Sequence, residues 1–271
     1  MFQQKILMCA PDYFGVDYVI NPWMEGNRGK VDPEPARRQW ANLKQALEEH
    51  AEICLIPPHP GLPDQVFTAN AGMVLGGKAV VSCFRAKERQ GEESFFREWF
   101  AKNGFTLEAW PETAFFEGAG DALLDRVAPV IWAGYGFRSD AAAPALLQKT
   151  FNRQAIGLRL VDPRFYHLDT CFCPLEGGVL LYFPPAFDEA GRQVIAALAP
   201  AEKRIEVEEE DALQFVCNAV DLNRHVFMNA ASESLQSRLR KAGFTPVLTP
   251  LSEFMKSGGS AKCLTLKLNE K

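Results

Sequence analysis

The pentapeptide Lys102-Asn103-Gly104-Phe105-Thr106 recurs later in the chain, with one residue changed, as Lys241-Ala242-Gly243-Phe244-Thr245. In both places a helical pattern precedes the glycine and a strand-like Phe-Thr follows it, which is typical of a helix that ends at a glycine. A repeated helix exit indicates that a whole structural unit is repeated. Outward from both copies, the same order of elements is predicted: strand, turn, strand, helix and strand.

Four such units follow one another in the chain. Apolar runs indicate the strands, and apolar positions three or four residues apart indicate the helices. The units comprise strands 65–75, 79–84 and 105–107 with helix 92–103; strands 115–124, 130–134 and 158–161 with helix 143–151; strands 169–175, 179–183 and 205–207 with helix 188–198; and strands 216–220 and 225–229 with helix 232–242. The pattern predicts an α/β fold made of repeated modules.

The segment before these units has its own elements. We expect a strand at 5–10, a helix that begins at Pro35 and a second strand at 52–56. Between the first strand and the helix, residues 12–27 form a loop rich in aromatic side chains. Asn21 in this loop either faces a pocket or is satisfied on the surface, and the sequence leaves both alternatives open.

Composition narrows the class of protein. The chain has 271 residues, 47% of them hydrophobic, which is enough for a substantial core in one or two domains. The formal net charge of -5, without a basic stripe, argues against a nucleic-acid partner. The sequence contains no run of about 18 apolar residues, so no membrane span is predicted. A small molecule, for instance a cation, is the expected partner.

The cysteines and histidines indicate where the protein works and what it lacks. Seven scattered cysteines, an odd number, suit a reducing compartment better than a disulfide framework, so a cytoplasmic location is expected. The four histidines form no His-Glu-x-x-His pattern, and the cysteines form no Cys-x-x-Cys pattern. We therefore predict no metal site.

One polar residue stands in the opening strand of each unit, and a cysteine continues the series. The positions are spaced by 45 to 51 residues: Asn70, Asp121, Asp169, Asn218 and Cys263. If the units close into a ring, equivalent positions converge on its axis. Polar groups are costly to bury unsatisfied, so such a cluster is expected to bind a polar ligand. The alternative is that each group is an ordinary strand end bonded to local backbone.

Cys263 lies in the sequence Ser-Gly-Gly-Ser-Ala-Lys-Cys-Leu-Thr-Leu at 257–266. The glycines provide access, and Lys262 places a positive charge beside the thiol, so Cys263 is predicted to be a nucleophile at the start of a strand. A single cysteine is more often a packing residue. The register of Cys263 with the polar series favours the nucleophile.

Several motifs on this frame resemble the guanidine-modifying enzyme superfamily. They are Phe-Thr-Ala-Asn at 67–70, Phe-Glu-Gly-Ala-Gly-Asp at 116–121, His-Leu-Asp at 167–169 and the cysteine segment at 259–265, in the family's order. The resemblance covers essentially the whole chain. It implies a pentein fold, a five-bladed α/β propeller with pseudo-fivefold symmetry, in a single guanidine-modifying domain over residues 1–271.

The resemblance also implies roles for particular residues. Cys263 matches the nucleophile, His167 the general acid/base and Glu117 the carboxylate of the family's Glu-Gly-Gly-Asp motif. That motif is one residue longer here, so either Glu117 or Asp121 could face the guanidinium. Arg89 matches the arginine that holds the substrate carboxylate, with Arg85 as the alternative. The other expected substrate-binding residues are Asn70, Asp121, Asp169, Asn21 and Asn218. We expect packing roles for the other histidines: His50, His59 and His225.

Asn70 bears on which reaction occurs. Deiminases usually have an aspartate here, which accepts from a cationic guanidinium but repels a neutral ureido oxygen; asparagine can hold either species. A second hydrolysis then becomes possible, and the sequence looks most similar to cyanobacterial-type arginine dihydrolases, which convert arginine to ornithine, carbon dioxide and ammonia. The resemblance implies a small cationic guanidinium substrate and no cofactor, and it leaves an oligomer open. Deiminase, dimethylargininase and amidinotransferase activities, or a non-enzymatic binding module, are the alternatives.

Overall fold

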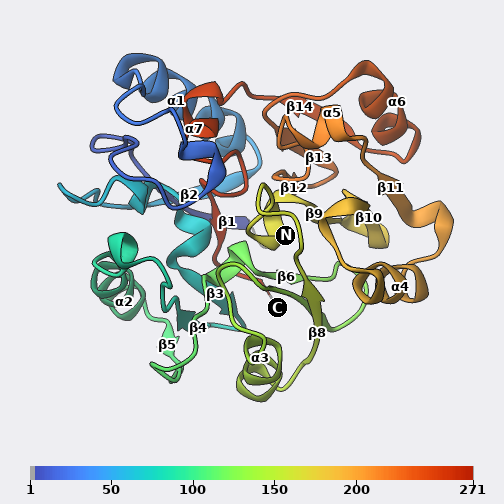
Figure 1. The fold of residues 1–271 in the computed structure, drawn as a ribbon, viewed down its shortest axis with the longest axis horizontal. Helices are drawn as coiled ribbons and strands as arrows, with labels where there is room; N and C mark the ends of the chain where they lie inside the picture. The colour runs from blue at the N-terminus through green and yellow to red at the C-terminus, as the bar shows by residue number, and fades with distance from the viewer. Residues whose placement is uncertain (1–3, 271) are drawn as a thin grey trace.

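Five three-stranded sheets surround a common axis in the computed structural model, which describes residues 4–270 (Figure 1). In each sheet the first two strands are antiparallel and the third is parallel to the second. A helix makes the crossover from the second strand to the third, as a parallel connection requires. The five crossover helices lie on the outside of the ring in Figure 1. The predicted pentein architecture is confirmed.

The elements follow the same order in every module. The bounds are β3 (Gly72–Leu75), β4 (Lys78–Val81), α2 (Glu92–Lys102) and β5 (Thr106–Leu107); β6 (Ala122–Leu124), β7 (Val130–Tyr135), α3 (Ala143–Phe151) and β8 (Gln154–Arg159); β9 (Phe172–Leu175), β10 (Val179–Tyr182), α4 (Glu189–Leu198) and β11 (Arg204–Glu206); and β12 (Val220–Leu222), β13 (His225–Met228), α6 (Glu233–Lys241) and β14 (Thr245–Leu248). Two short helices, α5 (Glu209–Ala212) and α7 (Ser252–Met255), lie in connecting segments.

The fifth module joins the two ends of the chain. Its strands are β15 (Leu266–Lys267), β1 (Gln4–Cys9) and β2 (Ala51–Ile56), and its helix is α1 (Pro33–Glu48). Because β15 is antiparallel to β1, the last strand takes the place that the opening strand has in the other modules. The ring is therefore closed by the segment that follows Cys263.

The predicted opening strands were too long. The four opening strands occupy only 72–75, 122–124, 172–175 and 220–222, and the residues before the first three form short 3₁₀ turns: η3 (Thr68–Ala71), η5 (Gly118–Gly120) and η6 (Leu168–Thr170). These turns are buried, and a short buried segment cannot be distinguished from a buried strand by its periodicity. The axial polar residues accordingly stand in turns before the strands, and Cys263 likewise precedes β15.

Helix boundaries were predicted to within one or two residues. Asp188 and Ser232, expected as first helical residues, are N-caps whose side chains accept from the backbone N–H groups of Gly191 and Leu235. Strand β8 begins four residues earlier than expected, because Gln154 and Gly157 interrupt its apolar pattern. These errors do not move any axial residue.

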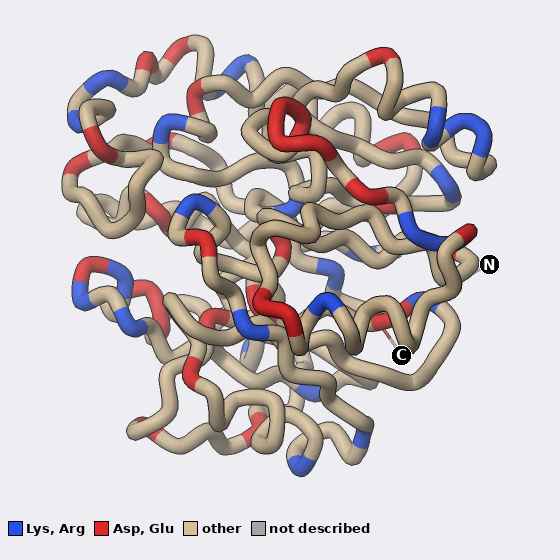
Figure 2. Tube along the Cα trace, turned by 45° about the vertical axis from the view of Figure 1, so that its right-hand side comes forward, with Lys and Arg blue, Asp and Glu red and all other residues tan. Residues whose placement is uncertain are grey.

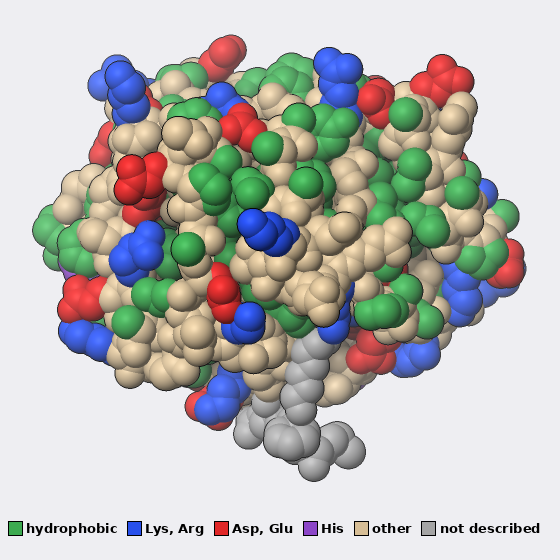
Figure 3. All heavy atoms as spheres, turned by 90° about the horizontal axis from the view of Figure 1, so that it is seen from below, with side chains coloured by type: hydrophobic (Ala, Val, Ile, Leu, Met, Phe, Trp, Pro, Cys, Tyr) green, Lys and Arg blue, Asp and Glu red, His purple; other side chains and the backbone are tan. Residues whose placement is uncertain are grey.

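The core lies between the sheets and the outer helices. On α2, Phe96 and Phe100 are buried, while Phe95 and Trp99 are only partly covered. Lys and Arg are interspersed with Asp and Glu along the chain (Figure 2), and side chains of both signs are dispersed over the face drawn in Figure 3. Among residues 4–270, no helix combines the length and apolar character needed to cross a membrane.

Candidate active site

Hydrogen bonds between neighbouring modules bring the axial residues together. The Asn70 amide donates to the Glu117 carbonyl (2.9 Å), and the Asp121 carboxylate accepts from the Leu168 N–H (3.0 Å). Asn218 donates to the Asp169 carbonyl (3.1 Å). Each of these side chains thus contacts the turn of the next or preceding module. The expected convergence on one axis is confirmed, and the ring buries its polar groups with partners.

Cys263 contacts two of these axial residues, Asn218 and Asp169. Its Sγ accepts from Asn218 Nδ2 at 3.1 Å and lies 3.6 Å from Asp169 Oδ2, to which the thiol can donate. The Cys263 N–H also donates to Asn218 Oδ1 (3.1 Å), so one amide holds both ends of the residue. Burial, and then the charge of Asp169, raise the pKa of the Cys263 thiol. Burial also raises the pKa of Asp169 to about 7, against the attraction of Lys262. The protein groups by themselves therefore favour a protonated thiol.

A buried carboxylate holds the histidine. His167 Nε2 lies 2.7 Å from Glu117 Oε2, and Arg138 Nη1 donates to the same oxygen at 3.0 Å. Burial alone would raise the pKa of Glu117, but Arg138 and His167 bring it well below its usual range. Glu117 is therefore ionised, and it fixes the orientation of the His167 ring.

Asn70 is held by an ion pair. Arg89 Nη1 donates to Asn70 Oδ1 at 2.8 Å, while its Nε and Nη2 donate to the two Glu92 oxygens at 2.9 and 2.8 Å. The bidentate pair is almost completely buried. Because Arg89 donates to Oδ1 and the Glu117 carbonyl accepts from Nδ2, the two ends of the Asn70 amide are assigned. One N–H and one lone pair of Asn70 remain for a ligand.

Two turns at the site approach neighbouring groups so closely that only glycine fits at certain positions. A Cβ at Gly120 would lie 2.4 Å from Asn70 Nδ2, and one at Gly259 would lie 2.3 Å from the Phe67 ring. Gly258 has φ +82°, and a Cβ there would lie 2.8 Å from the Tyr166 hydroxyl. The close approach of these backbones places the Asn70 amide and the cysteine turn against the site.

A small cavity lies at the centre of these contacts. Its lining includes Cys263 and His167 together with Asn70 and Arg89, and residues of the 12–27 loop cover it. Asn21 belongs to this cover: its amide donates to the Ser257 carbonyl at 3.0 Å and its Oδ1 caps the short turn that follows. The cavity measures about 10 Å³, roughly the space of one water molecule.

Comparison with known proteins identifies the family of this chain. The family described as N,N dimethylarginine dimethylhydrolase, eukaryotic, matches residues 12–269. The chain belongs to this family. Within the dimethylarginine dimethylhydrolase family and its relatives, the chain is 55% identical over 266 residues to the bifunctional arginine dihydrolase/ornithine cyclodeaminase ArgZ of Synechocystis, covering 98% of this chain and 38% of ArgZ. It thus spans less than half the length of that curated relative.

Solved structures of the N-terminal domain of ArgZ have the same fold. A Cys→Ser variant bound to its substrate superposes with a TM-score of 0.98 at 54% identity, covering 98% of each chain. An Asn→Ser variant covalently bound to a reaction intermediate also gives a TM-score of 0.98 at 54% identity. The resemblance to the guanidine-modifying superfamily is therefore confirmed.

The residues predicted for this family's site fall into two groups: those that line the cavity and those that lie behind the lining residues. Five of them line the cavity: Cys263, His167, Asn70, Arg89 and Asn21. Four lie behind them: Glu117 behind His167, Asp169 and Asn218 behind Cys263, and Asp121, whose carboxylate accepts from Ser139 (2.6 Å) and the Leu168 N–H. Neither the Glu117 nor the Asp121 carboxylate is among the residues that line this cavity, and which of the two faces the guanidinium stays a prediction.

Sequence reasoning missed several residues of the site. Asp64, Arg138 and Tyr166 line the cavity but stand outside the spacing of the repeat. Asp64 accepts from Tyr18 (2.8 Å) and Ser257 (3.1 Å), which ties the covering loop to the cysteine segment. A buried acid next to Pro63, or an arginine that follows an apolar strand, has no periodic signal in the sequence.

Other expected groups lie elsewhere. Arg85, the alternative anchor, pairs with Asp140 and stacks on Phe115, so it lies on the outer side of the Glu117 turn. His50 and His225 pack against each other with ring centroids 4.3 Å apart, and His59 stacks on Phe95. No group of metal-ligating side chains occurs within residues 4–270.

Proposed function

We propose that this chain is an arginine dihydrolase that hydrolyses the guanidinium group of L-arginine twice, within a single guanidine-modifying domain. The observation that supports it is the neutral Asn70 amide, fixed by Arg89, in one cavity with Cys263 and His167. The similarity to the substrate-bound ArgZ domain supports the same substrate. Ornithine, carbon dioxide and ammonia are the products.

The first hydrolysis begins with the cation. A guanidinium beside Cys263 supplies positive charge where the protein's own groups favour the thiol, so substrate binding favours the thiolate. The sulfur attacks the central carbon, and His167 protonates the departing ammonia. His167 then takes a proton from a water molecule, which cleaves the C–S bond of the covalent intermediate and leaves a ureido group. Glu117 positions the imidazole and stabilises its charged form.

The second hydrolysis uses the same groups. Cys263 attacks the ureido carbon, a second ammonia departs, and a second water releases a carbamate that decomposes to ornithine and carbon dioxide. Two water molecules are consumed, and two ammonia molecules and one carbon dioxide are released. Asn70 can donate its remaining N–H to the ureido oxygen, whereas an aspartate at this position would repel that oxygen.

Substrate entry requires the cover to move. The cavity of about 10 Å³ cannot contain arginine, and Asn21 and Met24 of the covering loop lie directly on it. We propose that the loop at 12–27 opens to admit the substrate and then excludes water that is not part of the reaction. Arg89 and Arg138 are the cavity's cations, and either could receive the substrate's α-carboxylate.

Product analysis tests the proposal. The purified chain is incubated with L-arginine, and citrulline, ornithine and ammonia are quantified by mass spectrometry and an ammonia assay. We expect ornithine with two equivalents of ammonia. The Asn70→Asp variant is expected to accumulate citrulline, while Asn103→Asp, at the end of α2 and remote from the cavity, keeps the wild-type products. Citrulline as the wild-type end product contradicts the double hydrolysis.

Dimethylargininase activity is the second candidate, because the matching family carries that description. Its chemistry is one hydrolysis at the same carbon, with dimethylamine in place of ammonia as the leaving group. Incubation with N,N-dimethylarginine distinguishes the candidates: citrulline and dimethylamine formed faster than products from L-arginine would favour this second function.

A further inference from the structure

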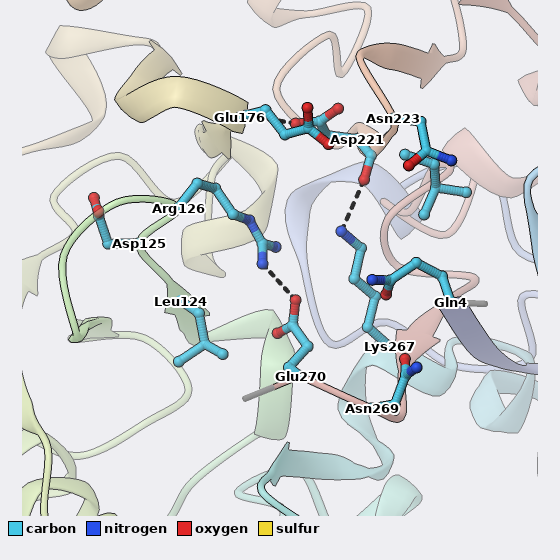
Figure 4. A pocket seen from close by; sticks show the side chains of 11 residues that line it. Gln4, Leu124, Asp125, Arg126, Glu176, Asp221, Asn223, Lys267, Asn269 and Glu270 are labelled. Carbon is cyan, nitrogen blue, oxygen red and sulfur yellow. Dashed lines mark hydrogen bonds and ion pairs between the residues drawn. The ribbon is translucent and has the colours of Figure 1, made fainter. Parts of the chain in front are cut away.

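A second cavity, of about 340 Å³, lies at the other end of the inner strands from Cys263 (Figure 4). The axial residues of the active site precede β6, β12 and β15, whereas this cavity is lined by the residues at which those strands end: Leu124, Leu222 and Lys267. Its volume falls in the range of small-molecule sites, about 300–1,000 Å³. The proposed function makes no use of it.

Two polar groups at this cavity lack partners. Asp221 is 5% exposed; its Oδ2 accepts from the Glu176 N–H at 2.6 Å, but its buried Oδ1 has no hydrogen bond within the described structure. The Arg126 Nε is also buried and unpaired among the described residues, although its Nη1 contacts Glu270. Leaving such groups unsatisfied costs about 1–3 kcal/mol each, so a partner from solution is expected.

Lys267 adds a second cation to the same wall. Its Nζ donates to the Asp221 carbonyl at 2.8 Å, which leaves two N–H groups of the ammonium for other partners. Burial, and then the charge of Arg126, lower the pKa of Lys267 to about 8. Figure 4 shows the Lys267 and Arg126 side chains reaching into the cavity from different segments, with Asp221 and Glu176 together on one side. An anion between the two cations would offset their repulsion.

The charges of this cavity suit a ligand with both signs. A simple anion would meet the cavity's four carboxylates, and a simple cation would meet Arg126 and Lys267; the carboxylates are Asp125, Glu176, Asp221 and Glu270. The wall also carries three neutral amide side chains: Gln4, Asn223 and Asn269. A zwitterion with a polar, uncharged side chain matches all three features.

We propose that this cavity binds a free α-amino acid with a neutral polar side chain. Its ammonium group contacts the Asp221 and Glu176 carboxylates, and its carboxylate contacts the Arg126 guanidinium and Lys267 Nζ. The side chain lies against the amides. The site is separate from the cavity at Cys263, because the inner strands lie between them.

Isothermal titration calorimetry with L-glutamine tests this on the full chain, with acetate and methylammonium as single-charge probes. We expect saturable binding of L-glutamine and at least tenfold weaker binding of either single-charge probe. Asp221→Asn is expected to weaken L-glutamine binding at least tenfold. Glu176→Gln, at a half-exposed position that should not disturb folding, is expected to weaken it severalfold. Glu98→Gln, on the exposed face of α2, is the matched control and should bind as the wild type does.

The outcomes separate this site from the active site. Activity towards L-arginine without L-glutamine should be unchanged in Asp221→Asn, because Asp221 contacts no group at Cys263. The proposal is overturned if L-glutamine gives no saturable heat, if acetate or methylammonium alone binds as tightly, or if both the Asp221 and Glu176 variants bind with wild-type affinity. None of these results depends on which guanidino compound the enzyme hydrolyses.

Discussion

The two ends of the propeller axis are built from the same inner strands, but they differ in how their polar groups are satisfied. At the Cys263 end the axial side chains hydrogen-bond to neighbouring modules, and the space left is about 10 Å³. At the Lys267 end about 340 Å³ remains open, and Asp221 Oδ1 and Arg126 Nε have no partner in the described chain. One end is preorganised and covered, and the other is incomplete.

The repeat fixes the geometry of the Cys263 end but not that of the Lys267 end. Equal spacing places one residue from each module at the Cys263 end, where fixed geometry is what covalent chemistry requires. The Lys267 end collects residues from strand ends and a hairpin turn, so its groups are less constrained. Substitutions at the first end should therefore change the rate of reaction, whereas substitutions at the second should change binding there and leave the rate intact.

The largest expected effect follows from Cys263→Ser. Loss of the thiolate nucleophile should lower kcat by about 10⁴-fold or more, because a neutral serine hydroxyl is a far weaker nucleophile than a thiolate. Steady-state assays with L-arginine and mass spectrometry of the trapped intermediate measure the effect. Cys54→Ser, at a half-buried position on β2, should retain wild-type rate. A Cys263→Ser enzyme with substantial activity would show that the chemistry lies at another residue.

Gly120→Ala should have the next largest effect. The added Cβ would lie 2.4 Å from Asn70 Nδ2 and 3.4 Å from the His167 ring, so the Asn70 amide must move. We expect kcat/KM to fall by about 10²-fold, because a displacement of about 1 Å at a positioning group has that consequence. Gly91→Ala is the control, since its nearest contact is the flexible Leu62 side chain. Equal kcat/KM values for the two variants would show that catalysis does not depend on the observed position of the Asn70 amide.

Much of this site could be predicted from the sequence because a repeat fixes its own spacing. Asn70, Asp121, Asp169, Asn218 and Cys263 were found by interval alone, and the structure brings them together. Their local conformation could not be found in the same way, because a short buried 3₁₀ turn and a short buried strand have no periodicity that distinguishes them.

The residues outside the repeat show the limit of this reasoning. Asp64 and Arg138 reach the cavity from connecting segments, and their positions depend on how loops cross the ring. The distinction between lining residues and those behind them also depends on side-chain direction: Asp121 is in register with Asn70, yet its carboxylate turns to Ser139. Spacing predicts which residues meet, but not which of them a ligand touches.

The pH dependence of stability is a smaller and more distributed effect. Burial raises the pKa of Asp169 and Glu92 to about 7 and that of Asp121 to about 6. Between about pH 4 and pH 7 the folded state therefore binds more protons than the unfolded state, and the free energy of unfolding should fall as pH rises through this window. Denaturant unfolding from pH 5 to pH 8 measures the slope.

Asp169→Asn isolates one contribution to that slope. The variant should lose part of the decline between pH 5 and pH 7, and at pH 8 it should be more stable relative to the wild type than at pH 5. Glu98→Gln, at the exposed surface, should leave the slope unchanged. If the free energy of unfolding has the same pH slope in Asp169→Asn and the wild type, the slope arises from groups other than Asp169.

Tyr18→Phe should have the smallest effect. This substitution tests the loop at 12–27, which covers the cavity at Cys263. The Tyr18 hydroxyl donates to Asp64 Oδ2 at 2.8 Å, and Asp64 also accepts from Ser257, so this bond ties the loop to the cysteine segment. Its loss should lower the free energy of unfolding by about 1–2 kcal/mol. KM should change while kcat stays within about twofold, because Tyr18 contacts none of the reacting groups. Tyr13→Phe, on an exposed ring of the same loop, serves as the control. If kcat instead fell sharply while the free energy of unfolding stayed unchanged, the Tyr18 hydroxyl would take part in the chemical step. The 12–27 loop would then belong to the catalytic site and would not serve only as its cover.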